Sequence, residues 1–190
     1  MIRKNWFLNA ACRDDGAKPN NLTDVAYNSL AWRWGGHPGW CATSKDGSIG
    51  SYVEWTLNVG ECAGKPMVFA CELGYVGSDT SRGEVVHIVD TSGVTLAALQ
   101  PGRPAQRAQL FRFTAPADGV LHIRFRGPRG DSKPAQLAVY NPQLELADTY
   151  DNRGTTPAYF NGDTYPRNSG GGGILLALFI HTSCGRCAHE

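Results

Sequence analysis

The feature that most constrains the fold of this chain is a strict two-residue alternation of apolar and polar side chains. The pattern runs through residues 52–59, 66–73 and 120–126. A period of two is typical of a β-strand that turns one face toward a core and the other toward solvent. The predicted buried faces comprise Val53, Trp55, Leu57, Val59, Met67, Phe69, Cys71, Leu73, Leu121, Ile123 and Phe125.

Further extended segments are predicted at residues 85–89, 107–114, 136–146 and 174–180. The chain has 23 glycines and 11 prolines in 190 residues, a share above the ~12% of average proteins, which favours frequent turns. Seven or eight strands separated by turns are typical of an antiparallel sandwich. We therefore predict an all-β, jelly-roll-like β-sandwich over residues 1–147. A Gly/Asn-rich arm follows over residues 148–190, with 174–180 as a final apolar strand that completes or extends the sandwich.

The charge balance and the apolar runs exclude several classes of partner. Eighteen basic and 17 acidic residues leave a net charge of +1, so we expect no nucleic-acid partner, which would need a surplus of Lys and Arg. No run of about 20 apolar residues exists, so we expect no membrane insertion. The apolar residues near the N-terminus are too few for a secretion signal, and Asn5 and Asn9 interrupt them. We expect synthesis in a cytoplasm without a signal peptide.

Three segments carry sequence motifs. Residues 5–14 read Asn-Trp-Phe-Leu-Asn-Ala-Ala-Cys-Arg-Asp, and residues 111–118 read Phe-Arg-Phe-Thr-Ala-Pro-Ala-Asp. Both resemble segments of carbohydrate-binding-type jelly rolls: the opening and a threonine-alanine-proline turn. The third is Asn-Pro-Gln-Leu-Glu at 141–145, followed by Thr-Pro-Ala-Tyr-Phe-Asn-Gly-Asp-Thr at 156–164. It is similar to the ending of minor tail proteins of phages that infect actinobacteria.

This resemblance implies a structural virion protein of a bacteriophage. It implies a minor tail component near the tail tip, with a jelly-roll surface that contacts a host-cell glycan. The implied partners are other virion proteins, further copies of the chain as a homo-oligomer, and the glycan. Two alternatives stay open: a capsid decoration or head-fibre protein that cements the shell, and a carbohydrate-binding module of a secreted enzyme system.

The family's acidic positions, which help to hold a structural calcium in related modules, differ here. Ala11-Cys12-Arg13 stands in place of Ser-Phe-Glu, and Tyr140-Asn141 stands where an Asp is often found. With these positions changed, the resemblance does not carry a calcium site over to this chain.

Trp32, Trp34 and Trp40 are the candidate glycan-binding residues. They lie in a Gly-rich segment, and in an extended chain Trp32 and Trp34 share one face. An indole ring stacks well on the apolar face of a sugar. Aromatic residues also suit a subunit interface or the cover of a sheet end, and both alternatives stay open.

Two further sets of candidates lie in the arm. Tyr159, Phe160, Asn161 and Asp163 are the candidate subunit-interface residues. His181, Cys184, Cys187 and His189 are candidate ligands for zinc, because thiolate and imidazole groups suit its tetrahedral geometry. All four crowd at one chain end, so a disulfide, a site completed by a neighbouring subunit and a frayed tail stay as alternatives. No other cofactor is predicted.

Catalytic patterns are weak. The sequence Gly-Ser-Ile-Gly at residues 47–50 is not a nucleophile elbow, and His37 near Cys41 is a poor indication of a nucleophile–base pair. The four glycines at 170–173 lack the Lys-Ser/Thr of a phosphate loop. We predict that the chain is not an enzyme.

Overall fold

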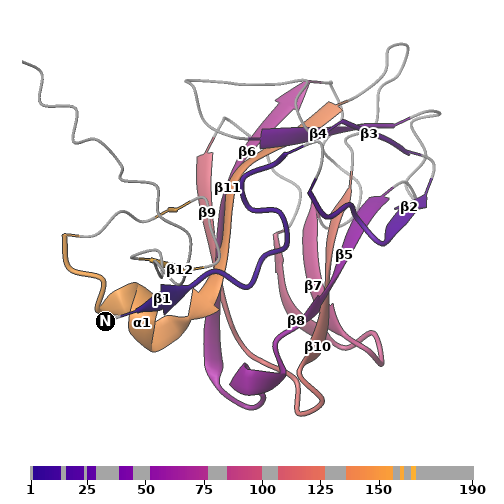
Figure 1. The fold of residues 1–190 in the computed structure, drawn as a ribbon. Coiled ribbons are helices and arrows are strands. Elements are labelled where there is room, and N and C mark those ends of the chain that lie inside the picture. The colour runs from indigo at the N-terminus through magenta and orange to yellow at the C-terminus, as the bar shows by residue number, and fades with distance from the viewer. Residues whose placement is uncertain are drawn as a thin grey trace, which may run out of the picture.

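The structure is a computed structural model. It describes residues 2–13, 16–23, 25–28, 39–44, 52–76, 85–99, 107–126, 136–155, 159–160 and 164–165. These residues form two facing layers of β-strands, with one short 3₁₀ helix, η1 (Gly60–Cys62), and one short α-helix, α1 (Ala147–Asp151) (Figure 1). No helix in these ranges is long and apolar enough to cross a bilayer. The strands are β1 (Arg3–Lys4), β2 (Asn21–Thr23), β3 (Val25–Asn28), β4 (Gly39–Ser44), β5 (Tyr52–Asn58), β6 (Pro66–Val76), β7 (Val86–Asp90), β8 (Thr95–Leu99), β9 (Arg107–Thr114), β10 (Val120–Arg126), β11 (Gln136–Leu146) and β12 (Thr164–Tyr165).

Both large sheets are antiparallel. One has the strand order β2-β5-β10-β7-β8, and the other has the order β3-β4-β11-β6-β9. From β4 to β11 the chain changes sheet at most connections, and this gives the strand order of a jelly roll. The prediction of an all-β sandwich is confirmed. The strands at β2, β3, β4 and β8 were not among the predicted extended segments.

The core lies between the two sheets, and the alternating residues supply it as predicted. In the β5–β10 pair, Val53 lies opposite Phe125, Trp55 opposite Ile123, and Leu57 opposite Leu121. All six side chains are fully buried. Aromatic rings from both sheets meet here, and Phe125 packs edge-on against Phe69 and Trp40. Phe7, from the N-terminal segment, completes the core by packing against Trp55 and Phe69.

A β-bulge divides β11 into two parts. Residues 136–140 pair with β4, and the pairing with β6 shifts register between Tyr140 and Gln143. Asn141 lies at the shift with a left-handed φ of 50°, a conformation that Asn adopts more readily than most residues, and Pro142 follows it. Beyond the bulge the N-terminal segment replaces β4 as the neighbour of β11. The Trp6 N–H donates to the Leu144 carbonyl (2.7 Å), and the Asn5 side chain accepts from the Leu144 N–H (2.9 Å).

The described part of the arm packs against the sandwich. Helix α1 contacts β6 and β11, and β12 pairs with β1 (Figure 1). Residues 147–151 form this helix, and no helix was predicted there. The predicted strand at 174–180 lies outside the described residues.

Candidate functional site

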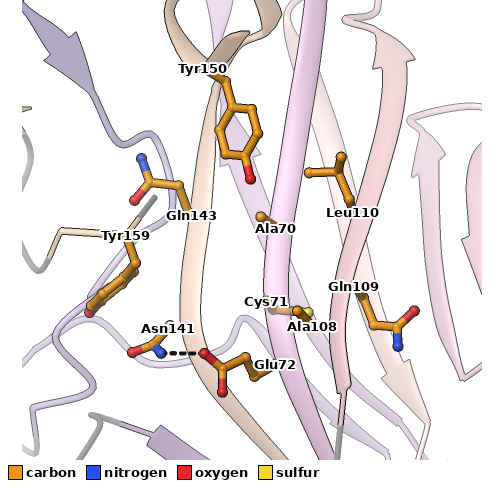
Figure 2. Close-up of a pocket in the computed structure, with 10 residues that line it drawn as sticks. All are labelled: Ala70, Cys71, Glu72, Ala108, Gln109, Leu110, Asn141, Gln143, Tyr150 and Tyr159. Atoms are coloured by element: carbon orange, nitrogen blue, oxygen red, sulfur yellow. Dashed lines mark hydrogen bonds between the residues drawn. The ribbon is translucent and has the colours of Figure 1, made fainter. Parts of the chain in front are cut away.

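A pocket opens on the outer face of the β3-β4-β11-β6-β9 sheet (Figure 2). It encloses about 150 Å³. Pockets for drug-sized ligands enclose about 300–1,000 Å³, so this one suits a single small chemical unit. The lining residues are Ala70, Cys71, Glu72, Ala108, Gln109, Leu110, Asn141, Gln143, Tyr150 and Tyr159.

Small side chains create the hollow. On β6 the core residues Phe69 and Cys71 alternate with Ala70 and Glu72, so the latter two face outward. Ala70 pairs across the sheet with Leu110 of β9, and Glu72 pairs with Ala108. The two alanines therefore leave space on the pleated surface where larger residues would fill it. Leu110 stands at one side, with 48% of its surface exposed.

Two tyrosines bound the pocket from outside the sheet. Tyr150 belongs to α1, and its ring points down toward Ala70 (Figure 2). The guanidinium of Arg153 stacks on this ring at 4.1 Å and donates to the Tyr150 carbonyl, which fixes the end of the helix. Tyr159 comes from the arm, and its hydroxyl donates to the Ala10 carbonyl at 2.7 Å. Burial raises the pKa of Tyr159, so its hydroxyl keeps its proton at neutral pH.

Polar side chains line the wall nearest β11. Asn141 Nδ2 donates to Glu72 Oε1 at 2.8 Å (Figure 2). Gln143 is fully buried, and its Oε1 accepts from Asn5 Nδ2 (3.2 Å) and from the Phe160 N–H (3.4 Å). Within the described part of the chain, Asn141 Oδ1 and Gln143 Nε2 are buried without a partner. An unsatisfied buried polar atom costs about 1–3 kcal/mol, so water or a ligand is expected to satisfy these two.

The chemistry of this pocket suits binding. It combines two aromatic rings and apolar side chains with a carboxylate, three amide side chains and tyrosine hydroxyls. Its described lining contains no histidine, and burial raises the pKa of the Cys71 thiol, which keeps it protonated and a poor nucleophile. That the chain is not an enzyme stays a prediction.

The structure corrects the prediction for Trp40. This residue lies on β4 with its side chain fully buried in the core, where its ring meets Trp55 and Phe125. A buried indole has no exposed face for a sugar, so Trp40 is a core residue. Side chains alternate between the two faces of β4, and Trp40 lies at a position that faces the core. Trp32 and Trp34 lie outside the described residues.

Of the four predicted interface residues, two lie within the described part of the chain and two do not. Phe160 is 7% exposed and lies against the guanidinium of Arg3, 5.0 Å from its ring centre, while Tyr159 bonds to Ala10. Phe160 is buried within its own chain, which corrects its assignment to a subunit interface. Tyr159 is only partly buried, and its assignment to an interface stays a prediction. Asn161 and Asp163 lie outside the described residues.

The predicted zinc ligands His181, Cys184, Cys187 and His189 also lie outside the described residues. Within the residues that are described, no group of three or more His, Cys, Asp or Glu side chains could hold a metal ion. Cys12, Cys41, Cys62 and Cys71 are buried and form no disulfides. The prediction that Cys71 is a small core residue is confirmed.

The pocket was not predicted, although the sequence contains two features that point to it. The alternation in β6 already places Glu72 on the outer face, and the Asn141-Pro142 pair interrupts an otherwise continuous strand. Tyr150 had no signal, because the short helix that presents it was not predicted. The pocket exists only once β6, β9, β11, α1 and the arm come together.

Comparisons with known proteins find matches among solved structures, which include the two described below. No protein-family model and no curated protein matches this chain. A solved CBM4 structure matches with a TM-score of 0.42 and 16% identity, over 67% of this chain and 81% of the other. The enzymatically active domain of tailspike protein 4 from bacteriophage CBA120 matches with a TM-score of 0.37 and 14% identity. That match covers 66% of this chain but only 18% of the chain in that structure.

Proposed function

We propose that this protein is a carbohydrate-binding structural protein of a bacteriophage virion. In this proposal it is a minor tail component that holds one sugar unit of a host-surface glycan in the pocket bounded by Tyr150 and Tyr159. The observation that carries the proposal is the pocket itself. It places tyrosine rings, a carboxylate and amide side chains around a hollow of about 150 Å³ on an outer sheet face.

The chemistry of a sugar matches these groups. A pyranose ring has apolar C–H faces, and aromatic rings attract them because the face of a π-system is electron-rich. Its hydroxyl groups both donate and accept hydrogen bonds. Glu72 offers acceptors, and the amide side chains that line the pocket offer both kinds of group.

The virion role is supported by the motif at residues 141–164. The motif that resembles phage minor tail proteins supplies Asn141 and Gln143 to the pocket, and Tyr159 as well. One sugar in a small pocket binds weakly. Several copies on one particle would raise weak single-site binding to a useful avidity, because later contacts become intramolecular.

The test is binding of the full chain to a glycan array, with three variants. Tyr150→Ala removes an aromatic wall, and Ala70→Leu fills the hollow. Tyr52→Ala is the matched control, because Tyr52 lies on β5 in the other sheet. We expect both pocket variants to lose glycan binding by about tenfold or more, as for a lost stacking group, and the control to retain it. Glycan binding that survives both pocket variants, or no glycan binding by the wild type, would contradict the pocket assignment.

The virion role has a separate test. An antibody or gold label on this protein in purified particles is expected to mark the tail tip. Labels spread over the head would favour the capsid-decoration alternative. A protein absent from particles and exported from the cell would favour the module of a secreted enzyme system.

A further inference from the structure

We infer that the pocket prefers a sugar with a primary ammonium group, an amino sugar that is not N-acetylated, and that Glu72 is the counter-ion. This inference rests on the proposed function, because it names the class of sugar that the same pocket takes. It follows from the charges around the pocket and from the way Glu72 is held.

Glu72 is the only described lining residue that carries a charge at neutral pH. The other lining side chains are alanine, leucine, cysteine, amide and tyrosine. Glu72 forms no ion pair with any described residue. The arginines close to the site have partners other than Glu72: Arg112 pairs with Asp151 at 2.6 Å, and Arg153 stacks on the ring of Tyr150. The pocket therefore presents a negative group to a ligand, which disfavours anionic sugars and favours cationic ones.

Asn141 holds the carboxylate in place. Its left-handed conformation at the β-bulge turns its side chain to Glu72, where Nδ2 donates to Oε1 at 2.8 Å. Asn adopts this conformation more readily than most residues, so the bulge can hold the amide in this position. The hydrogen bond orders one carboxylate oxygen and leaves the second oxygen, Oε2, available.

An ammonium group complements this arrangement. It has three donors and no acceptor, so it matches the Glu72 carboxylate, in a pocket that two electron-rich tyrosine rings also line. Hydrogen bonds between charged partners are about twice as strong as neutral ones. N-acetylation removes the charge and adds bulk, in a hollow of only about 150 Å³.

A neutral sugar is the competing ligand, because Glu72 could instead accept hydrogen bonds from two hydroxyl groups. Matched sugars separate the two readings. Glucose and glucosamine differ only at the 2-position, as do galactose and galactosamine, and mannose and mannosamine. N-acetylglucosamine keeps the nitrogen but removes its charge.

The experiment is titration of the full chain with these sugars by NMR, at low and high salt. We expect the best amino sugar to bind about tenfold or more tightly than its neutral match, and this ratio to fall at high salt. Glu72→Gln is expected to abolish the preference for the amino sugar, while neutral sugars still bind. Asp148→Asn is the control, because this exposed carboxylate of α1 bonds to Asn152 and does not line the pocket.

Three outcomes would overturn the inference. Equal binding of amino and neutral sugars would leave the proposed function standing and assign Glu72 to hydroxyl groups. An amino-sugar preference that survives in Glu72→Gln would place the counter-ion elsewhere. No binding of any sugar would overturn the proposed function as well. The NMR spectrum of each variant shows whether it has folded.

Discussion

The side chains of Asn5 and Gln143, 138 positions apart in the sequence, are joined by a hydrogen bond from Nδ2 to Oε1 at 3.2 Å. Asn5 belongs to the opening motif of the chain, and Gln143 to the motif near its end. Asn5 also donates to the Pro142 carbonyl and accepts from the N–H groups of Leu144 and Phe7. The two motifs thus form one contact. It satisfies backbone hydrogen-bonding groups of β11 at the point where β4 stops pairing with this strand. Gln143 carries this contact to the wall of the pocket.

Asn5→Ala is expected to destabilise the fold. The substitution leaves the buried N–H groups of Leu144 and Phe7 without their acceptor, which we expect to cost about 2–3 kcal/mol. Chemical denaturation measures this free energy. Asn21→Ala is the control, because Asn21 is exposed on β2 and, among the described residues, its side chain bonds only to the side chains of Tyr52 and Thr23; we expect a change within about 0.5 kcal/mol. Equal effects of the two substitutions would argue against the role of Asn5.

The buried ion pair between Arg3 and Glu145 makes a second prediction. Arg3 Nε donates to Glu145 Oε2 at 3.0 Å, Arg3 Nη2 contacts Oε1, and Thr149 also donates to the carboxylate. Arg3→Met alone leaves a buried charge without its partner and should cost about 3–5 kcal/mol. The double variant Arg3→Met, Glu145→Met should recover most of that loss, because neither charge remains. Unfolding of both single variants and the double variant completes the cycle. A double variant as unstable as the sum of the singles would contradict the coupling.

The buried cysteines are expected to resist alkylation. Burial raises the pKa of Cys12 to about 12 and also raises the pKa of Cys71. At mildly alkaline pH both thiols therefore stay protonated, and the protonated form is a poor nucleophile. Treatment with iodoacetamide, mapped by mass spectrometry, should leave Cys12 and Cys71 unmodified in the native protein and modify them in concentrated guanidinium. Rapid modification of Cys12 in the native protein would contradict the burial of its thiol.

The pair of Arg112 and Asp151 holds α1, and with it Tyr150, beside β9. The hydrogen bond from Arg112 lowers the pKa of Asp151 below its ordinary value of 3.8. A lowered folded pKa means that the pair stabilises the protein above the unfolded pKa, and that this contribution is lost as pH falls through the folded pKa. NMR titration of the Asp151 carboxyl should show the low value, and Arg112→Gln should move it back toward 3.8. An Asp151 pKa unchanged by Arg112→Gln would contradict the pairing.

Much of the fold could be predicted from the sequence, because side-chain alternation reports directly which face of a strand is buried. It placed Trp55, Phe69 and Ile123 in the core correctly. Alternation gives no information on Phe7, which reaches the core from a segment with two residues of β-structure. Trp40 was misjudged because its Gly-rich surroundings resembled a loop, whereas pairing with β11 makes the segment a strand.

The pocket could not be predicted, for a physical reason. Its residues come from three strands, a helix and the arm, and their proximity depends on the register of β6 with β9 and β11. The bulge at Asn141 shifts the register with β6; the Asn141-Pro142 pair marks an interruption in the sequence, but it does not show which residues of β6 and β9 then lie opposite β11. Glu72 and Tyr159 are 87 positions apart, and only the folded chain brings them to one hollow.

The most direct test of the account is NMR mapping of a bound sugar on the isotope-labelled full chain. The side-chain amides of Asn141 and Gln143 carry N–H groups that NMR detects, and both residues line the pocket. We predict that the best-binding sugar shifts the signals of both amides and of the Tyr150 and Tyr159 rings. The ring signals of Tyr52, on the other sheet, stay unchanged. Shifts confined to the β2-β5-β10-β7-β8 sheet, with those four residues unaffected, would contradict it.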